Sequence, residues 1–204
     1  MARWAPLLWA TRTRFPSADR GRLPEAQSEQ ERGEDLAGRS PPRAGVATRD
    51  DMSVESQLQE MGFPLPPAPK PVAAYVPALQ VGNLVYTSGQ ICLADGQLRY
   101  RGKVGRDLSV EQGYEAARLC CLNALAAVKS VTGDLDRVVR VVKVTGFVNS
   151  APGFAEQPKV MNGASELLGR LFGAAGQHVR SAVGAPDLPL DSACEVELVV
   201  EVRG

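Results

Sequence analysis

An arginine and a glutamate near the C-terminal end of the chain have side chains that could do chemistry together. Arg180 lies in the run HVRSAVGA, and Glu195 opens the alternating segment CEVELVVEV fifteen residues later. An arginine placed among apolar residues is costly unless an anion meets it. Its planar guanidinium can bind a carboxylate through two parallel donors, which a lysine cannot imitate. The anion could be an internal carboxylate or a ligand.

Other reactive side chains are few. The sole histidine, His178, lies two residues before the arginine. Histidine titrates near neutrality, but the sequence offers it no triad partner, so we expect it at the surface or rim of a site. The cysteines lack metal-ligand spacing, and one histidine makes a zinc or iron site improbable. We expect reduced, buried thiols at Cys92, Cys120, Cys121 and Cys194. For Cys120 and Cys121 we expect core packing rather than nucleophilic catalysis.

Length and charge limit the class of protein. The chain has 204 residues, enough for one domain with a tail, and its hydrophobic content of 44% suffices for a globular core. Basic and acidic residues number 23 each, so the formal net charge is zero. A neutral chain gives no electrostatic argument for a nucleic acid or membrane partner. No apolar run approaches the ~18 residues that cross a bilayer, and we expect a cytoplasmic protein.

The composition changes near residue 52. Residues 1–51 contain nine arginines and no lysine, with no sustained helical or strand period. We expect a disordered or non-native extension there that is dispensable, although residues 1–22 faintly resemble an organelle transit peptide. Residues 52–71 predict a short helix capped by Ser53 and ended by Gly62, followed by a stiff proline-rich connector. The compact domain is expected over residues 72–204.

Helix and strand patterns alternate within that domain. Strand-like runs meet at two predicted hairpin turns, residues 82–83 and 95–96. Ser109 and Gln112 form a capping box that opens a long amphipathic helix, which ends at Gly133. The first half of the domain is therefore expected to contain hairpins followed by a helix.

The second half repeats this alternation. Residues 137–150 predict a strand buried on much of both faces, and Pro158 and Gly173 delimit a second helix. In the last strand apolar residues alternate with mostly acidic ones, from Cys194 to Val202. The element order predicts an α+β domain with one mixed sheet and two helices on one face. The other face would be uncovered, so we expect oligomerisation through it.

Four segments together resemble the YjgF/RidA family, the reactive intermediate imine deaminases also called endoribonuclease L-PSP-like. They are YVPALQVGNLVYTSGQI, VKVTGFVNS, NGASELL and VRSAVGAPDLPLDSACEVE, within residues 65–203. The last segment is similar to the family's signature region, including the spacing of Arg180 and Glu195. The resemblance implies a chorismate mutase-like fold and a homotrimer with a central β-barrel. It also implies a ligand cleft at each subunit interface.

The same resemblance implies a reaction and a site. The reaction is hydrolytic deamination of reactive 2-imino or enamine acids to 2-oxo acids and ammonia, with no metal or cofactor. Arg180 would hold the carboxylate of the small imine substrate, and Glu195 would position the attacking water. The positions that match the family's substrate-binding residues are Tyr75, Ser88, Gly89, Asn162 and Pro189.

The chain departs from the family pattern around the implied cleft. Ala182 stands where the family commonly has cysteine, and Pro77 stands where it often has glutamine. His178 and Val179 replace the usual small residues before the arginine, and Cys194 stands where a larger aliphatic residue precedes the glutamate. These changes leave the substrate side chain open and mark a divergent branch of the family.

Structural roles are alternatives for the implied site residues. Arg180 could form a salt bridge across a subunit interface, and Glu195 could line a polar barrel interior beside Glu197. Asn162 could cap a helix, and Tyr75 could be an interface aromatic. For function, the alternative to an enzyme is a non-catalytic trimeric protein that binds small carboxylates or has a regulatory role. A ribonuclease is disfavoured by the neutral charge, the single histidine and the sparse aromatic residues.

Overall fold

A computed structural model of the protein describes residues 52–68 and 74–204. Its helices are α1 (Val54–Glu60), α2 (Val110–Thr132) and α3 (Gln157–Phe172), with 3-10 turns at Gly173–Gly176 and Pro189–Asp191. Its strands are β1 (Ala78–Val81), β2 (Leu84–Thr87), β3 (Gln90–Ile91), β4 (Leu93–Ala94), β5 (Gln97–Leu98), β6 (Val138–Asn149), β7 (Val179–Ala185) and β8 (Cys194–Val202). Within these residues no helix is both long enough and apolar enough to cross a bilayer.

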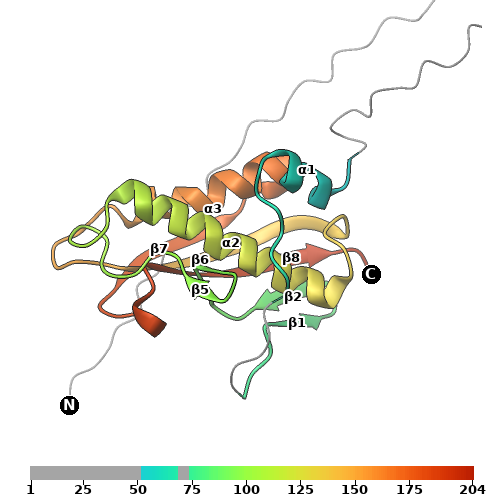
Figure 1. Ribbon diagram of the computed structural model, residues 1–204. Coiled ribbons are helices and arrows are strands. Elements are labelled where there is room, and N and C mark those ends of the chain that lie inside the picture. Colours follow the sequence, from blue (N-terminus) through green and yellow to red (C-terminus); the bar gives the residue numbers. More distant parts are fainter. Residues whose placement is uncertain (1–51, 69–73) are drawn as a thin grey trace, which may run out of the picture. The chain divides into compact units, whose positions relative to one another are not determined.

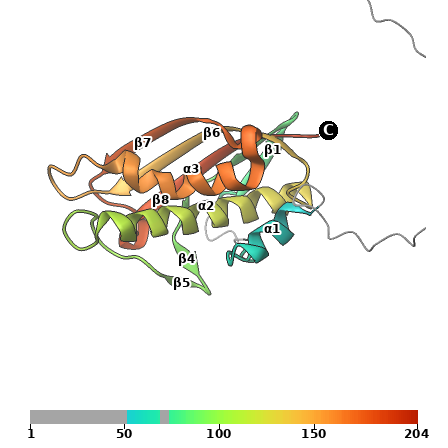
Figure 2. The same cartoon turned by 90° about the horizontal axis from the view of Figure 1, so that it is seen from above.

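One mixed sheet organises the domain. Its strand order is β1-β2-β8-β6-β7, with β3 also paired to β8, and β4 and β5 form a separate two-stranded sheet. The neighbouring strands are antiparallel except β6 and β7, which are parallel and are joined through α3. Figures 1 and 2 show α2 and α3 side by side across one face of the sheet. The predicted α+β fold with two helices on one face is confirmed.

Local signals set the ends of the elements. The Ser109 hydroxyl accepts from the Gln112 amide and the Gln112 side chain accepts from the Ser109 amide, so the predicted capping box at the start of α2 is present. The hairpin between β4 and β5 turns at Asp95 and Gly96, both in the left-handed region with φ of 54° and 73°. A type I′ turn demands such angles, which aspartate and glycine tolerate best. The predicted turns and helix ends are therefore confirmed here.

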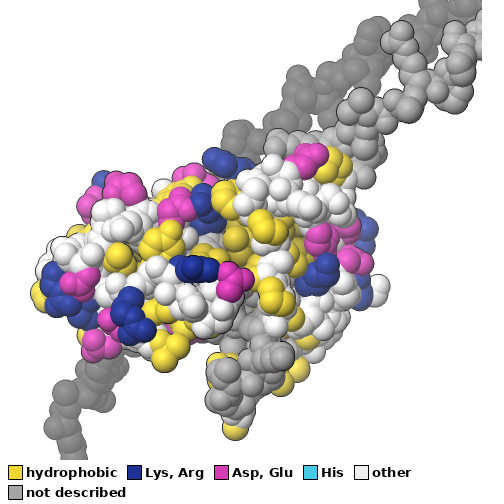
Figure 3. Space-filling view, viewed as in Figure 1, with side chains coloured by type: hydrophobic (Ala, Val, Ile, Leu, Met, Phe, Trp, Pro, Cys, Tyr) yellow, Lys and Arg dark blue, Asp and Glu magenta, His cyan; other side chains and the backbone are white. Residues whose placement is uncertain are grey.

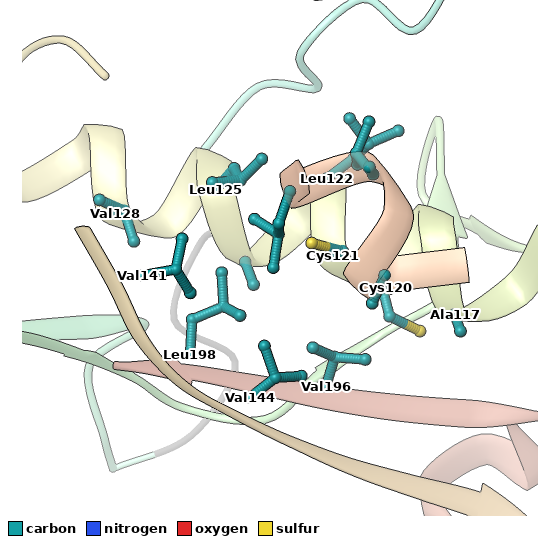
Figure 4. Packing of buried hydrophobic residues seen from close by; sticks show 14 of the residues in the cluster. Ala117, Cys120, Cys121, Leu122, Leu125, Val128, Val141, Val144, Val196 and Leu198 are labelled. Carbon is teal, nitrogen blue, oxygen red and sulfur yellow. The ribbon is translucent and has the colours of Figure 1, made fainter. Parts of the chain in front are cut away.

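The hydrophobic core lies between the two long helices and the sheet. Figure 4 shows side chains of α2, including Cys120, Cys121 and Leu125, facing those of β6 and β8, including Val144 and Leu198. Residues of β8 alternate strictly between buried and half-buried positions, as predicted. All four cysteines are free and buried, as predicted.

The prediction that β6 is buried on much of both faces is wrong for the single chain. Val139, Arg140 and Lys143 are exposed, so this strand buries only the face that meets the helices. Two register shifts against β8 interrupt its alternation, between Val138 and Arg140 and between Val141 and Lys143. The run of β-branched residues raises the strand propensity on both faces, but it cannot supply a second layer where the chain provides no helix.

The uncovered face of the sheet carries large apolar side chains. Strand pairing places Leu79 opposite Tyr86, and Tyr86 opposite Val199, so these residues share the face away from the helices. Five of the exposed large hydrophobic residues lie on this open face: Leu79, Val81, Tyr86, Val179 and Val183. They form two groups at opposite edges of the sheet, and Glu195, Glu197 and Lys143 of β8 and β6 lie on the same face between them. Exposed apolar side chains on an uncovered sheet face are typical of an interaction face.

The N-terminal helix α1 is part of the same packed unit. Val54 and Leu58 belong to the hydrophobic core, although the compact domain was expected only from residue 72. The Glu55 carboxylate accepts from the Leu135 amide at 3.1 Å and pairs with Lys129 at 3.0 Å. Residues 1–51 lie outside the described residues, so their expected dispensability stays a prediction.

Candidate functional site

Arg180 faces the helices from the outer strand β7. It pairs in register with Val144 of β6, whose side chain is buried under α2 and α3. Because successive strand residues point to opposite faces, Arg180 lies on the other face from Val179. Its sequence neighbours Val179 and Ser181 therefore point to the open face, away from the Arg180 side chain.

Polar groups of α3 hold the Arg180 guanidinium. Its Nη1 donates to Asn162 Oδ1 at 3.0 Å and to Ser165 Oγ at 2.9 Å. Its Nη2 donates to the Pro158 carbonyl at 3.2 Å. All three partners are uncharged, and no acidic side chain of the described residues forms an ion pair with Arg180. The internal carboxylate considered as its anion is thus absent from the described part of the chain.

Two donors of this guanidinium remain for a ligand. A guanidinium carries five N–H groups, and three of them have partners among the described residues. One N–H on Nε and one on Nη2 are left. These are neighbouring nitrogens of the planar fork, which can present two donors to a carboxylate. Arg180 is half-buried, so a ligand can reach it while much of the side chain is held.

His178 has a partner that the sequence did not reveal. Its Nε2 lies 2.9 Å from Ser165 Oγ, and its Nδ1 lies 2.6 Å from the Gly176 carbonyl oxygen. Ser165 therefore contacts both His178 and Arg180. His178 is half-buried and hydrogen-bonded on both ring nitrogens, which is compatible with the expected place at the rim of a site. The sequence does hold an indication that Ser165 lies near Arg180. Ser165 follows Asn162 by three residues, so the two side chains lie on the same face of the helix.

Glu195 lies on the open face of the sheet, at the start of β8. It is paired with Ile91 of β3 and Phe147 of β6. Its carboxylate rests against Gly89, where an added Cβ would come 1.7 Å from Oε1. A larger residue at this position would require the Glu195 carboxylate to move. Gly89 and Glu195, both predicted as site residues, are therefore in direct contact.

Burial and a like charge perturb Glu195. Partial burial raises the pKa of its carboxyl above the ordinary value, and Glu197 two residues further along the strand raises it further. Among the described residues no group donates a hydrogen bond to this carboxylate. A carboxylate without a donor, and with a raised pKa, takes up protons more readily than a solvated one. Glu195 thus has the electrostatic character of a general base or acid.

A single chain does not bring Arg180 and Glu195 together. They lie on opposite faces of the sheet, on β7 and β8, with β6 between these strands. Arg180 is level with Val144, whereas Glu195 is level with Phe147. Within one chain the sheet therefore separates the two side chains.

The remaining predicted site residues divide between these two regions or lie apart. Asn162 contacts Arg180, whereas Ser88 adjoins Gly89 and donates to the Val76 carbonyl at 2.7 Å. Tyr75 is half-exposed, with no hydrogen bond to its hydroxyl among the described residues. Pro189 opens the 3-10 turn before β8. No hydrogen bond among the described residues joins Tyr75 or Pro189 to Arg180 or Glu195.

The loop that carries Pro189 is strained and braced. Leu190 and Asp191 both have φ in the left-handed region, 55° and 61°. Asn149 donates to Asp191 at 3.0 Å and accepts from Lys103 at 2.8 Å. Bracing of this kind sustains a strained backbone.

No group of three or more potential metal ligands occurs among the residues that the structure describes.

Comparison with known families identifies the class of protein. The family model described as "YjgF/chorismate mutase-like, putative endoribonuclease" matches residues 55–202. The chain therefore belongs to the YjgF/chorismate mutase-like family. This agrees with the mixed sheet covered by helices on one face.

Of three similar proteins, one has a name that states a reaction. Protein TCP17 from Trypanosoma cruzi is 43% identical over 151 residues, which cover 74% of this chain and 94% of that protein. The 2-iminobutanoate/2-iminopropanoate deaminase from Dermatophagoides farinae is 31% identical over 138 residues, or 68% of this chain and 93% of that enzyme. The crystal structure of Atu1372 from Agrobacterium tumefaciens, a protein of unknown function, is 44% identical and superposes with a TM-score of 0.69. It covers 74% of this chain and 92% of that one.

Proposed function

We propose that this protein hydrolyses small 2-imino acids to 2-oxo acids and ammonia at clefts between subunits. The observation that carries the proposal is the Arg180 guanidinium, held by three neutral partners with two donors left. A guanidinium fixed in this way suits a small carboxylate. The similarity of this chain to a 2-iminobutanoate/2-iminopropanoate deaminase suggests the substrate class.

The chemistry needs only modest help from the protein. Water adds to the carbon of a protonated imine, the C–N bond breaks, and ammonia leaves as the 2-oxo acid forms. Glu195 would accept a proton from the attacking water and return it to the nitrogen before the C–N bond breaks, a role that suits a poorly solvated carboxylate with a raised pKa. Arg180 would fix the substrate carboxylate so that the imine carbon meets that water. No metal or redox step enters the scheme.

Assembly into a homotrimer is part of the proposal. The open face carries exposed Leu79, Val81, Tyr86, Val179 and Val183, and closure of three such sheets into a barrel would cover it. Arg180 and Glu195 lie on opposite faces, so one protomer would supply the anchor and the next the base. Light scattering should give the mass of three chains, and a stable monomer at micromolar concentration would contradict the interfacial site.

The activity can be tested directly. An amino-acid oxidase generates 2-iminobutanoate in situ, and wild-type protein should accelerate ammonia release above the spontaneous rate. Arg180→Lys, which keeps the charge, is the matched control and should be close to the spontaneous rate. Equal rates with and without wild-type protein would reject the proposed reaction.

A non-catalytic carboxylate-binding protein is the second candidate. Its support is that the two relatives with 43% and 44% identity carry no reaction in their names. It predicts that 2-oxobutanoate binds in an Arg180-dependent manner while imine hydrolysis stays at the spontaneous rate. A ribonuclease has less support, because the face seen in Figure 3 mixes basic and acidic side chains instead of gathering basic ones.

A further inference from the structure

A chain of hydrogen bonds runs behind Arg180 and ends on the backbone. Arg180 Nη1 donates to Ser165 Oγ at 2.9 Å, and this oxygen lies 2.9 Å from His178 Nε2. His178 Nδ1 lies 2.6 Å from the Gly176 carbonyl oxygen. A carbonyl oxygen can only accept, so Nδ1 must carry the hydrogen. In the neutral ring Nε2 is then an acceptor, and the Ser165 hydroxyl donates to it.

This direction of donation matters for Ser165. A serine within a helix commonly turns its hydroxyl hydrogen to the carbonyl four residues earlier. Here His178 takes that hydrogen, and the lone pairs of Ser165 Oγ remain for Arg180. Asn162, one helical turn earlier, accepts the other Nη1 hydrogen at 3.0 Å. Two acceptors on one face of α3 therefore fix the plane of the guanidinium.

We infer that His178, acting through Ser165, is a positioning residue for Arg180 in carboxylate binding. The relay holds Nη1 against α3, so that the free N–H groups on Nε and Nη2 keep one orientation toward a ligand. His178 does not touch the substrate in this role. The inference rests on the proposed function, since it assigns a residue that prepares the same anchor.

Two substitutions of similar size separate the two ends of the imidazole. Asparagine places its amide near the position of Nδ1, and glutamine places its amide near the position of Nε2. His178→Asn can keep the contact with Gly176 but loses Ser165. His178→Gln can accept from the Ser165 hydroxyl but loses Gly176. A role through Ser165 predicts that glutamine rescues and asparagine does not.

The expected kinetic result is a change in KM rather than in kcat. His178→Asn should raise the KM for 2-iminobutanoate, and the Kd for 2-oxobutanoate, about fivefold to tenfold, the loss expected for one hydrogen bond in the anchor. His178→Gln should stay within about twofold of wild type. Ser165→Ala should raise the KM at least as much as His178→Asn, because it also removes the acceptor of Arg180 Nη1. The double variant should be no worse than Ser165→Ala alone, because both changes break one relay. Equal KM values for wild type and His178→Asn would overturn the inference.

A second measurement does not depend on the reaction. The Nε–H signal of Arg180 in a nitrogen-15 NMR spectrum reports whether the guanidinium is held, and the His178 nitrogen shifts report its tautomer. His178→Asn should broaden the Arg180 signal or speed its solvent exchange, and His178→Gln should restore it. An unchanged signal in His178→Asn overturns the relay.

The two proposals can therefore fail separately. If wild-type protein neither hydrolyses 2-iminobutanoate nor binds 2-oxobutanoate, the proposed function is wrong, while the Arg180 signal still decides whether the relay exists. If wild type is active and both His178 variants lower thermal stability alike without a difference in KM, the histidine serves the fold alone and the inference is wrong.

Discussion

The two halves of the candidate site are built in opposite ways. At the Arg180 half, α3 supplies three acceptors within 3.2 Å, and the guanidinium is fixed before any ligand arrives. At the Glu195 half, the carboxylate rests on Gly89 with no donor among the described residues, and its pKa is raised. The anchor is complete within one chain, whereas the reactive carboxylate is left without a hydrogen-bond donor.

This difference follows from what each group must do. An anchor works best when its geometry is set in advance, because the entropy lost in ordering the side chain then does not weaken binding. A general base works best when its proton affinity is high, and hydrogen bonds to its charged form would lower that affinity. The contrast predicts distinct consequences for substitutions in the two halves.

The largest effect is expected when the base is removed. Glu195→Gln keeps the shape of the side chain but cannot accept the proton from water. We expect kcat to fall by about 10²- to 10⁴-fold with a small change in KM, since general base catalysis contributes on this order. Steady-state kinetics with 2-iminobutanoate measures both constants. A rise in KM with kcat unchanged would assign Glu195 to substrate binding, and the two halves of the site would then no longer differ in role.

A comparable loss is expected at the anchor, but it should appear in binding. In Arg180→Lys the charge remains, while the two parallel donors and the contacts with Asn162 and Ser165 are lost. A charge-assisted pair in a desolvated site is worth about 2 to 5 kcal/mol, or about thirtyfold to several thousandfold in affinity. Titration calorimetry with 2-oxobutanoate measures it. A weakened trimer with unchanged carboxylate affinity would instead make Arg180 an assembly residue.

Crowding Gly89 should damage the Glu195 half alone. Gly89→Ala brings a methyl group to 1.7 Å from the present position of Glu195 Oε1, so the carboxylate must rotate away. We expect kcat to fall about tenfold or more, as misplacement of a catalytic group does, with 2-oxobutanoate affinity near wild type. Gly169→Ala in α3, where an added Cβ meets nothing within 4 Å, is the control for the same change of residue type in open space. Full activity of Gly89→Ala would show that the present position of the carboxylate is not the working one.

The smallest effect concerns stability and pH. The pKa of Glu195 is raised by burial, and secondarily by Glu197, so the folded chain binds this proton more tightly than the unfolded one. Its contribution to stability is present below about pH 4.5 and is lost as the pH rises through the raised pKa. Glu195→Gln should therefore unfold at a higher temperature than wild type at pH 7, and the difference should vanish below about pH 4.5. A lower melting temperature at pH 7 would reveal a favourable partner for the carboxylate in the assembly.

The same carboxyl predicts the acid limb of activity. A base must be deprotonated, so the rate should rise with pH through the raised pKa of Glu195 rather than near the ordinary value of a glutamate. Glu197→Gln removes the secondary cause of the shift and should move this limb to lower pH.

The sequence by itself determined the elements and their order. The capping box of Ser109 and Gln112, the turn at residues 95–96 and the alternation of β8 depend on residues a few positions apart, and each was predicted correctly. The identity of the family was likewise available, because its motifs are contiguous. Such local features survive without knowledge of the packing, since capping, turn geometry and strand periodicity act within one element.

Only the tertiary structure decided how the candidate site is arranged. The contact of Glu195 with Gly89 joins β8 to the segment before β3, and the partners of Arg180 come from α3. The link between Ser165 and His178 spans thirteen residues and joins α3 to the residue directly before β7. These contacts depend on strand register and on which face of the sheet each residue occupies, and a shift of one residue would reverse them. For this reason the sequence identified Arg180 and Glu195 as a pair, while the fold placed them on opposite faces of one sheet.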